Sequence, residues 1–158
     1  MQKQILDHLE GLIENLDTAV LLITHDLGLA AERATRVIVM QHGHIVEQGP
    51  SREILTNPQH PYTKKLIAAA PSLAAQRSET RHHKSSDSGL TLLQVKGVTK
   101  RFLLPSSRPW KKEYFTAVNN VDLSIKQMHT TAIVGESGSG KSTLAKMMLG
   151  LLCLLYTS

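Results

Sequence analysis

Apolar residues follow two kinds of pattern in the first part of the chain. Leucine and isoleucine recur at helical spacing in residues 5–16, which predicts an amphipathic helix. Two short runs that are apolar almost throughout come next, AVLLIT (19–24) and RVIVM (36–40). Such runs are typical of parallel strands that are covered on both faces. Together with a helix predicted at 27–34, they indicate an α/β fold with a parallel sheet.

The rest of this first block is predicted to contain a hairpin strand and two helices. A glycine-centred turn leads into HIVEQG (44–49), which we expect to return as an edge strand. Helices are predicted at 50–55 and 62–70. The composition then changes, since residues 74–90 are rich in serine and charged side chains and offer little to bury. We interpret this segment as a linker.

A second block follows the linker. Strands are predicted at 91–98 and 116–125, and the proline-containing stretch 101–115 is predicted to be a loop. TAIV (131–134) reads as a short buried strand that runs directly into a glycine-rich segment. KSTLAKMMLGLL (141–152) is then predicted to be a helix.

Composition and charge narrow the function classes. The 158 residues are 41% hydrophobic and 20% charged, with a formal net charge of +5, which are values of a globular protein. The basic residues are scattered, so a solvated surface is favoured over a nucleic-acid interface. The single cysteine excludes an internal disulfide framework and fits a reducing cytosol. No apolar run is long enough to span a bilayer and no signal peptide is recognisable, so we expect any membrane association to depend on a partner.

The strongest motif is GESGSGKST at 135–143, a full match to the phosphate-binding loop pattern. Its glycines allow tight turns whose N–H groups converge on phosphate oxygens, and a helix beginning there directs its positive dipole end at the anion. Lys141 is expected to contact the β- and γ-phosphates of ATP, and the Ser142 hydroxyl to bind Mg²⁺. The predicted nucleotide-binding residues of the loop are Gly135, Glu136, Ser137, Gly138, Ser139, Gly140, Lys141, Ser142 and Thr143.

His25 is a second candidate, because it stands just past a predicted buried strand, where open α/β sheets place their ligands. A histidine there can hydrogen-bond a γ-phosphate and orient attacking water. A purely structural histidine is the alternative. His42 and His44 flank a turn glycine. No cysteine pair or acidic cluster in the sequence completes a zinc site with them.

Three stretches resemble the ATP-binding-cassette (ABC) ATPases. LLITHDLG followed by VIVMQHGHIVEQG (37–49) is similar to the region around the family's His-loop, which implies a catalytic role for His25. His-Pro-Tyr-Thr at 60–63 resembles a C-terminal extension found in the peptide-importer branch. The stretch from VKGVTKRF to the phosphate loop resembles the opening of another ABC domain. In that comparison Phe102 falls where an aromatic residue stacks on adenine.

The resemblance implies a P-loop NTPase fold with a parallel sheet core and an antiparallel β subdomain. It also implies the tail of one ABC domain followed by the head of a second, as in tandem importers of peptides or glutathione. The expected divisions are 1–56 (end of the first domain), 57–73 (importer-type extension), 74–90 (linker), 91–151 (start of the second domain) and 152–158 (an atypical tail).

The family relationship implies an ATPase subunit that powers solute uptake at the cytoplasmic face of the inner membrane. Its partners would be membrane-spanning permease subunits and an extracytoplasmic solute-binding protein, and its ATPase domains would pair as a dimer. Nucleic acid is not expected as a partner. The Leu-Ser-Gly-Gly-Gln signature and an acidic magnesium-binding strand do not occur in the sequence. A nucleotide-binding fragment without catalysis or transport is therefore one alternative, and an ABC ATPase of the soluble type is another.

The two blocks also carry complementary pieces of one core. The strand at 131–134 needs neighbours on both edges and cover on both faces. In the ATPase family that the chain resembles, the strand before the phosphate loop lies between the strand that ends in the His-loop and the strand that follows it. The resemblance therefore implies that 131–134 pairs in parallel between 19–24 and 36–40, which would bring His25 and the glycine loop to one sheet edge. The turn at Met128–His129 lacks the glycine that the family has there, which predicts either a strained or a longer turn.

Overall fold

The structure is a computed structural model that describes residues 18–70, 90–105 and 112–152. The helix predicted at 5–16, almost all of the predicted linker and most of the atypical tail lie outside these ranges. No helix within the described ranges is both long and apolar enough to cross a bilayer.

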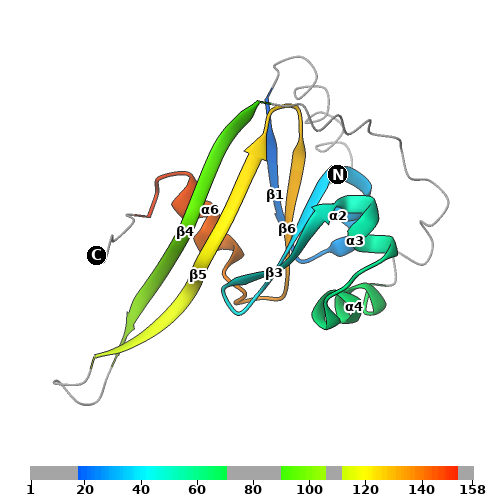
Figure 1. The fold of residues 1–158 in the computed structure, drawn as a ribbon. Coiled ribbons are helices and arrows are strands. Elements are labelled where there is room, and N and C mark those ends of the chain that lie inside the picture. Colours follow the sequence, from blue (N-terminus) through cyan, green and yellow to red (C-terminus); the bar gives the residue numbers. More distant parts are fainter. Residues whose placement is uncertain (1–17, 71–89, 106–111, 153–158) are drawn as a thin grey trace, which may run out of the picture.

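A four-stranded sheet forms the centre of the molecule (Figure 1), in the order β1 (Val20–Thr24), β6 (Thr130–Val134), β2 (Arg36–Gln41) and β3 (His44–Pro50). Strand β6 is parallel to both of its neighbours, with Ile133 level with Ile23 on one side and Ile38 on the other. Strand β3 closes the edge in antiparallel fashion. The predicted arrangement, in which the strand of the second block inserts between two strands of the first, is confirmed.

The second sheet is a long two-stranded antiparallel ribbon made by β4 (Thr91–Leu104) and β5 (Glu113–Lys126). The prediction of a loop over 101–115 is wrong at both ends, because both strands continue into it. Phe102 pairs with Phe115 and Leu103 with Tyr114, and such aromatic and aliphatic cross-strand pairs stabilise a ribbon. Pro105 comes just after β4 and so removes no ladder hydrogen bond.

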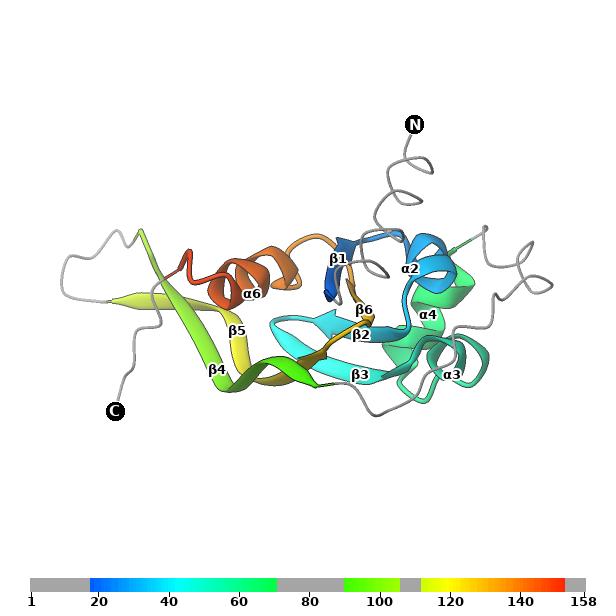
Figure 2. The same cartoon turned by 90° about the horizontal axis from the view of Figure 1, so that it is seen from above.

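Helices flank both faces of the central sheet (Figure 2). The helices α2 (Leu27–Arg33), α3 (Ser51–Thr56) and α4 (Pro61–Ala68) gather on one side, and α6 (Lys141–Met148) lies with the ribbon on the other. Helix α2 begins where the Asp26 carboxylate accepts hydrogen bonds from two backbone N–H groups, a typical N-cap. Helix α6 is shorter than the predicted 141–152, since Gly150 turns the chain with φ +70°.

Alternate residues of the central strands supply two separate cores. Val37, Val39, Ala132 and Val134 pack against α2, α3 and α4, and Ile38, Met40 and Ile133 pack against α6 and the ribbon. This is why successive residues in the middle of these strands are apolar. The core of the second face consists of Ile38, Met40, Val118, Val121, Leu123, Ile133, Leu144 and Met147.

Candidate phosphate-binding site

The glycine-rich loop leaves the carboxyl end of β6, between β1 and β2. His25 directly follows the last residue of β1, and β1 and β6 run parallel with Thr24 level with Val134. His25 and the loop therefore lie at the same edge of the sheet, as predicted. The imidazole of His25 is exposed. Parallel α/β sheets bind their ligands at this edge.

Lys141, the first residue of α6, turns its side chain back over the loop that precedes it. Its Nζ donates to the carbonyl oxygens of Gly135 and Glu136, each at 2.7 Å, and to Ser139 Oγ at 3.2 Å. Burial lowers the pKa of the Lys141 ammonium from its usual 10.5. The loop thus holds a partly desolvated cation at the N-terminus of a helix, and both features favour an anion.

The remaining loop residues divide into exposed and buried ones. Glu136, Ser137 and Gly138 are exposed, and so is Ser142 in the first turn of α6. Thr143 is half-buried, whereas Ser139 is only 4% exposed. The predicted phosphate and Mg²⁺ contacts of Ser137 and Ser142 are therefore open to solvent in this structure.

Close packing against two other segments fixes the end of the loop at Ser139 and Gly140. Gly140 has φ +98°, and a Cβ at this position would collide with the carbonyl oxygen of Ala117 on β5. Gly43, in the turn between β2 and β3, donates its N–H to the Ser139 carbonyl at 3.0 Å and accepts the N–H of Asn119 at 2.9 Å. The β2–β3 turn and the ribbon therefore form one continuous support beneath the loop.

A tyrosine hydroxyl contacts the start of the loop at Glu136. The backbone N–H of Glu136 donates to Tyr62 Oη at 3.0 Å. Tyr62 lies in the His-Pro-Tyr-Thr stretch, at the start of α4. Neither Tyr62 nor Gly43 was among the predicted site residues, although both belong to motifs visible in the sequence. The sequence alone does not show that the fold places these two motifs against the loop.

Phe102, the predicted adenine-stacking residue, lies on β4 in the outer part of the ribbon. Its side chain is 39% exposed, and the Lys100 ammonium lies 5.7 Å from the centre of its ring. Phe115 is its cross-strand partner. The ring is thus partly exposed, and the lysine ammonium lies over it.

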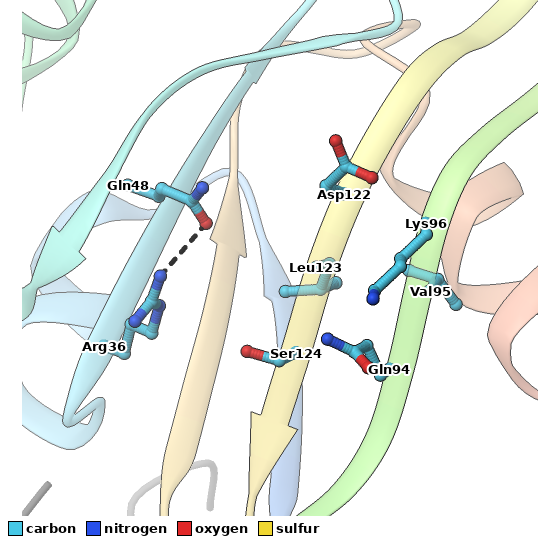
Figure 3. A pocket seen from close by; sticks show the side chains of 8 residues that line it. All are labelled: Arg36, Gln48, Gln94, Val95, Lys96, Asp122, Leu123 and Ser124. Atoms are coloured by element: carbon cyan, nitrogen blue, oxygen red, sulfur yellow. Dashed lines mark hydrogen bonds between the residues drawn. The ribbon is translucent and has the colours of Figure 1, made fainter.

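A shallow polar pocket lies elsewhere and is a separate feature (Figure 3). Arg36 and Gln48 line one side of it, and their side chains share a hydrogen bond of 3.1 Å. Gln94, Lys96, Asp122 and Ser124 of the ribbon line the other side. Arg36 begins β2 and is level with Thr131 near the start of β6. The pocket is therefore at the opposite end of the strands from the phosphate loop.

Comparison with known proteins gave two family matches and a set of similar full-length proteins. Residues 46–97 match the family described as "Oligopeptide/dipeptide transporter, C-terminal region", and residues 118–154 match the family "ABC transporter". The "Glutathione import ATP-binding protein GsiA" of Salmonella typhimurium LT2 is 36% identical over an alignment 173 positions long, gaps included, which covers 96% of this chain and 27% of that protein. GsiA of Escherichia coli K12 is 35% identical over the same coverage. The chain thus spans about a quarter of the length of these curated relatives.

Proposed function

Because the chain belongs to the ABC ATPases of the peptide and glutathione importer family, we propose that it is part of the ATP-binding component of an ABC importer. The observation that carries the proposal is the phosphate loop at the carboxyl edge of a parallel sheet, with the Lys141 ammonium held over it. The substrate class we propose is peptides or a similar small solute, such as the glutathione named for the relatives. Membrane-spanning permease subunits and an extracytoplasmic solute-binding protein would be its partners, at the cytoplasmic face of the membrane.

The proposed roles follow the chemistry of each group. The exposed residues Ser137 and Gly138 would receive phosphate oxygens, with Lys141 releasing its carbonyl partners to pair with them. Ser142 would bind Mg²⁺ through its hydroxyl, and Phe102 would stack on adenine. His25 would hydrogen-bond the γ-phosphate and orient water, so it is the proposed catalytic residue.

For this chain alone we propose nucleotide binding without hydrolysis. Phosphoryl transfer needs a positioned metal and a residue that orients the nucleophile, and the sequence has no acidic strand motif to hold the metal. The importer assignment is favoured over a soluble ABC ATPase by the match of residues 46–97 to the oligopeptide transporter region. We further propose that this match and the phosphate-loop match represent successive ABC domains of one longer protein.

Calorimetric titration with Mg-ATP tests the proposal. The wild-type chain should bind weakly, and Lys141→Ala should abolish the binding because the loop loses its cation. Lys146→Ala is the matched control, since it removes an exposed lysine from the same helix. Wild-type and Lys146→Ala chains that both fail to bind would contradict nucleotide binding. Turnover that Lys141→Ala eliminates would contradict the absence of hydrolysis.

A further inference from the structure

Tyr62 links the importer-type segment to the phosphate loop through a single hydroxyl group. Its side chain is only 7% exposed, and the ring belongs to the core that contains Leu27 and Val134. At the edge of this core its hydroxyl accepts the Glu136 N–H at 3.0 Å. A phenylalanine would fill the same space, so core packing alone explains the ring but not the hydroxyl.

The tyrosine is itself held by a short chain of hydrogen bonds from β3. The two carboxylate oxygens of Glu47 accept the backbone N–H groups of Gln59 at 2.8 Å and of His60 at 3.1 Å. His60 Nδ1 then accepts the N–H of Tyr62 at 3.2 Å, which caps the first turn of α4. These contacts fix the backbone at the start of α4 and, with it, the direction in which the tyrosine side chain extends.

The hydrogen bond determines how the first turn of the loop is oriented. Because the Glu136 N–H donates to Tyr62, it is directed into the protein and is not offered to a ligand. The Glu136 carbonyl also has protein partners, namely the Ser139 N–H at 3.2 Å and Lys141 Nζ at 2.7 Å. Both backbone polar groups of Glu136 thus have protein partners, although the residue itself is exposed, as are Ser137 and Gly138. Losing the tyrosine contact would leave a backbone donor unpaired and free to rotate.

We propose that Tyr62 is a positioning residue of the phosphate loop, and that its hydroxyl holds Glu136 in the orientation in which the following N–H groups receive phosphate. Nucleotide binding in the loop is then coupled to the packing of segment 57–63 against the loop, because each stabilises the same loop conformation. The coupling rests on the proposed nucleotide binding, whereas the positioning contact does not.

The test compares Tyr62→Phe with Tyr114→Phe, which removes the same hydroxyl from a tyrosine that is 55% exposed on the ribbon. Amide hydrogen exchange at Glu136 is the first measurement. Tyr62→Phe should raise the exchange rate about tenfold, and Tyr114→Phe should leave it unchanged. The second measurement is affinity for Mg-ATP, which Tyr62→Phe should weaken about fivefold, the size expected for one hydrogen bond. An unchanged exchange rate, or an affinity within twofold of wild type, would overturn the inference.

Fluorine NMR of the wild-type chain labelled with 3-fluorotyrosine tests the coupling without a substitution at Tyr62. The Tyr62 resonance, assigned by its loss in Tyr62→Phe, should shift when Mg-ATP is added and should not shift in Lys141→Ala. A Tyr62 resonance that does not shift when ATP binds would overturn the coupling. If the wild-type chain binds no ATP, the proposed function and the coupling both fail, and the Glu136 exchange rate alone decides whether Tyr62 positions the loop.

Discussion

The carbonyl oxygen of Ser139 accepts a hydrogen bond of 3.0 Å from the backbone N–H of Gly43, so the two sequence blocks meet inside the phosphate loop. Gly43 belongs to the β2–β3 turn of the first block, and Ser139 is a buried residue of the loop itself. The loop is therefore shaped by a turn that lies far from it in the sequence.

Replacing Gly43 by Ala should destabilise the protein more than the left-handed backbone conformation of this residue alone would predict. Gly43 has φ +81°, and an added Cβ would lie 2.9 Å from the Ala117 carbonyl oxygen. We expect a loss of about 2–3 kcal/mol in the free energy of unfolding, of which about 1 kcal/mol is backbone strain. Gly150→Ala is the control, because Gly150 has φ +70° with open space around it. Urea unfolding that gave equal losses for the two variants would show that the contact with Ala117 is unimportant.

The turn before β6 carries strain that a substitution should relieve. Met128 has φ +57° and a side chain that is 57% exposed, which confirms the strained turn predicted from the missing glycine. A non-glycine residue in this conformation costs about 1–2 kcal/mol. We expect Met128→Gly to raise the free energy of unfolding by about 0.5–1 kcal/mol, the gain being reduced by the entropy of the unfolded glycine. Gln127→Gly, at a neighbouring residue without positive φ, should lower it. A Met128→Gly variant that is less stable than wild type in urea would contradict this account.

The order of the central strands could be predicted because the chain resembles a family in which the phosphate-loop strand lies between two such neighbours. A strand such as Thr130–Val134, apolar on both faces, has to be covered and paired on all sides, and the first block offered two strands of the same kind. The motif at Lys141 likewise predicts a phosphate-binding loop from residue type and spacing.

What could not be predicted depends on contacts between distant residues. The ribbon extends through 101–104 because Phe102 meets Phe115 across the strands, a pairing that outweighs the loop signal of the nearby prolines. The hydrogen bond from Glu136 to Tyr62 is of the same kind. The sequence marks the tyrosine as part of a motif, but only the fold shows which backbone group its hydroxyl reaches.

Glu47 should make the stability of the chain depend on pH in the acidic range. Burial by itself would raise the pKa of this carboxyl, but the N–H groups of Gln59 and His60, together with the Thr63 side chain and the His60 imidazole, outweigh it and hold the pKa below its usual 4.5. A depressed folded-state pKa gives stability that is complete above the unfolded value and is lost as pH falls through the folded value. We therefore expect the contribution to be constant above about pH 4.5 and to disappear below it.

The variant Glu47→Gln removes this dependence and should cost about 1 kcal/mol at neutral pH. Glu53→Gln, which changes an exposed carboxylate on α3, is the control and should alter neither value by more than a few tenths of a kcal/mol. Urea midpoints measured between pH 3 and pH 7 provide the comparison. The role of Glu47 would be refuted if the wild type and Glu47→Gln lost stability in parallel below pH 4.5.

His25 and Lys141 lie at the same sheet edge here because β1 pairs with β6. In a longer protein with two ABC domains we expect these residues to serve different ATP sites, since each block would then pair with the missing half of its own domain. The register puts Val20 level with Thr130, near the start of both strands and away from the loop. Their strands are hydrogen-bonded neighbours, which brings the two positions within reach of a disulfide.

Cysteines at these two positions should therefore report which strands are paired. In the present chain, Val20→Cys with Thr130→Cys, in a background with Cys153→Ser, should form an intramolecular disulfide on mild oxidation, detected by mass after thiol blocking. A matched pair at Val20 and Leu92, an exposed residue of β4, should not form one, because β4 belongs to the other sheet. In a two-domain parent the pair equivalent to Val20 and Thr130 should stay reduced, since its members would lie in different domains. Efficient disulfide formation by that pair within the parent monomer would mean that the two strands paired here as β1 and β6 are paired there as well. His25 and Lys141 would then share one nucleotide.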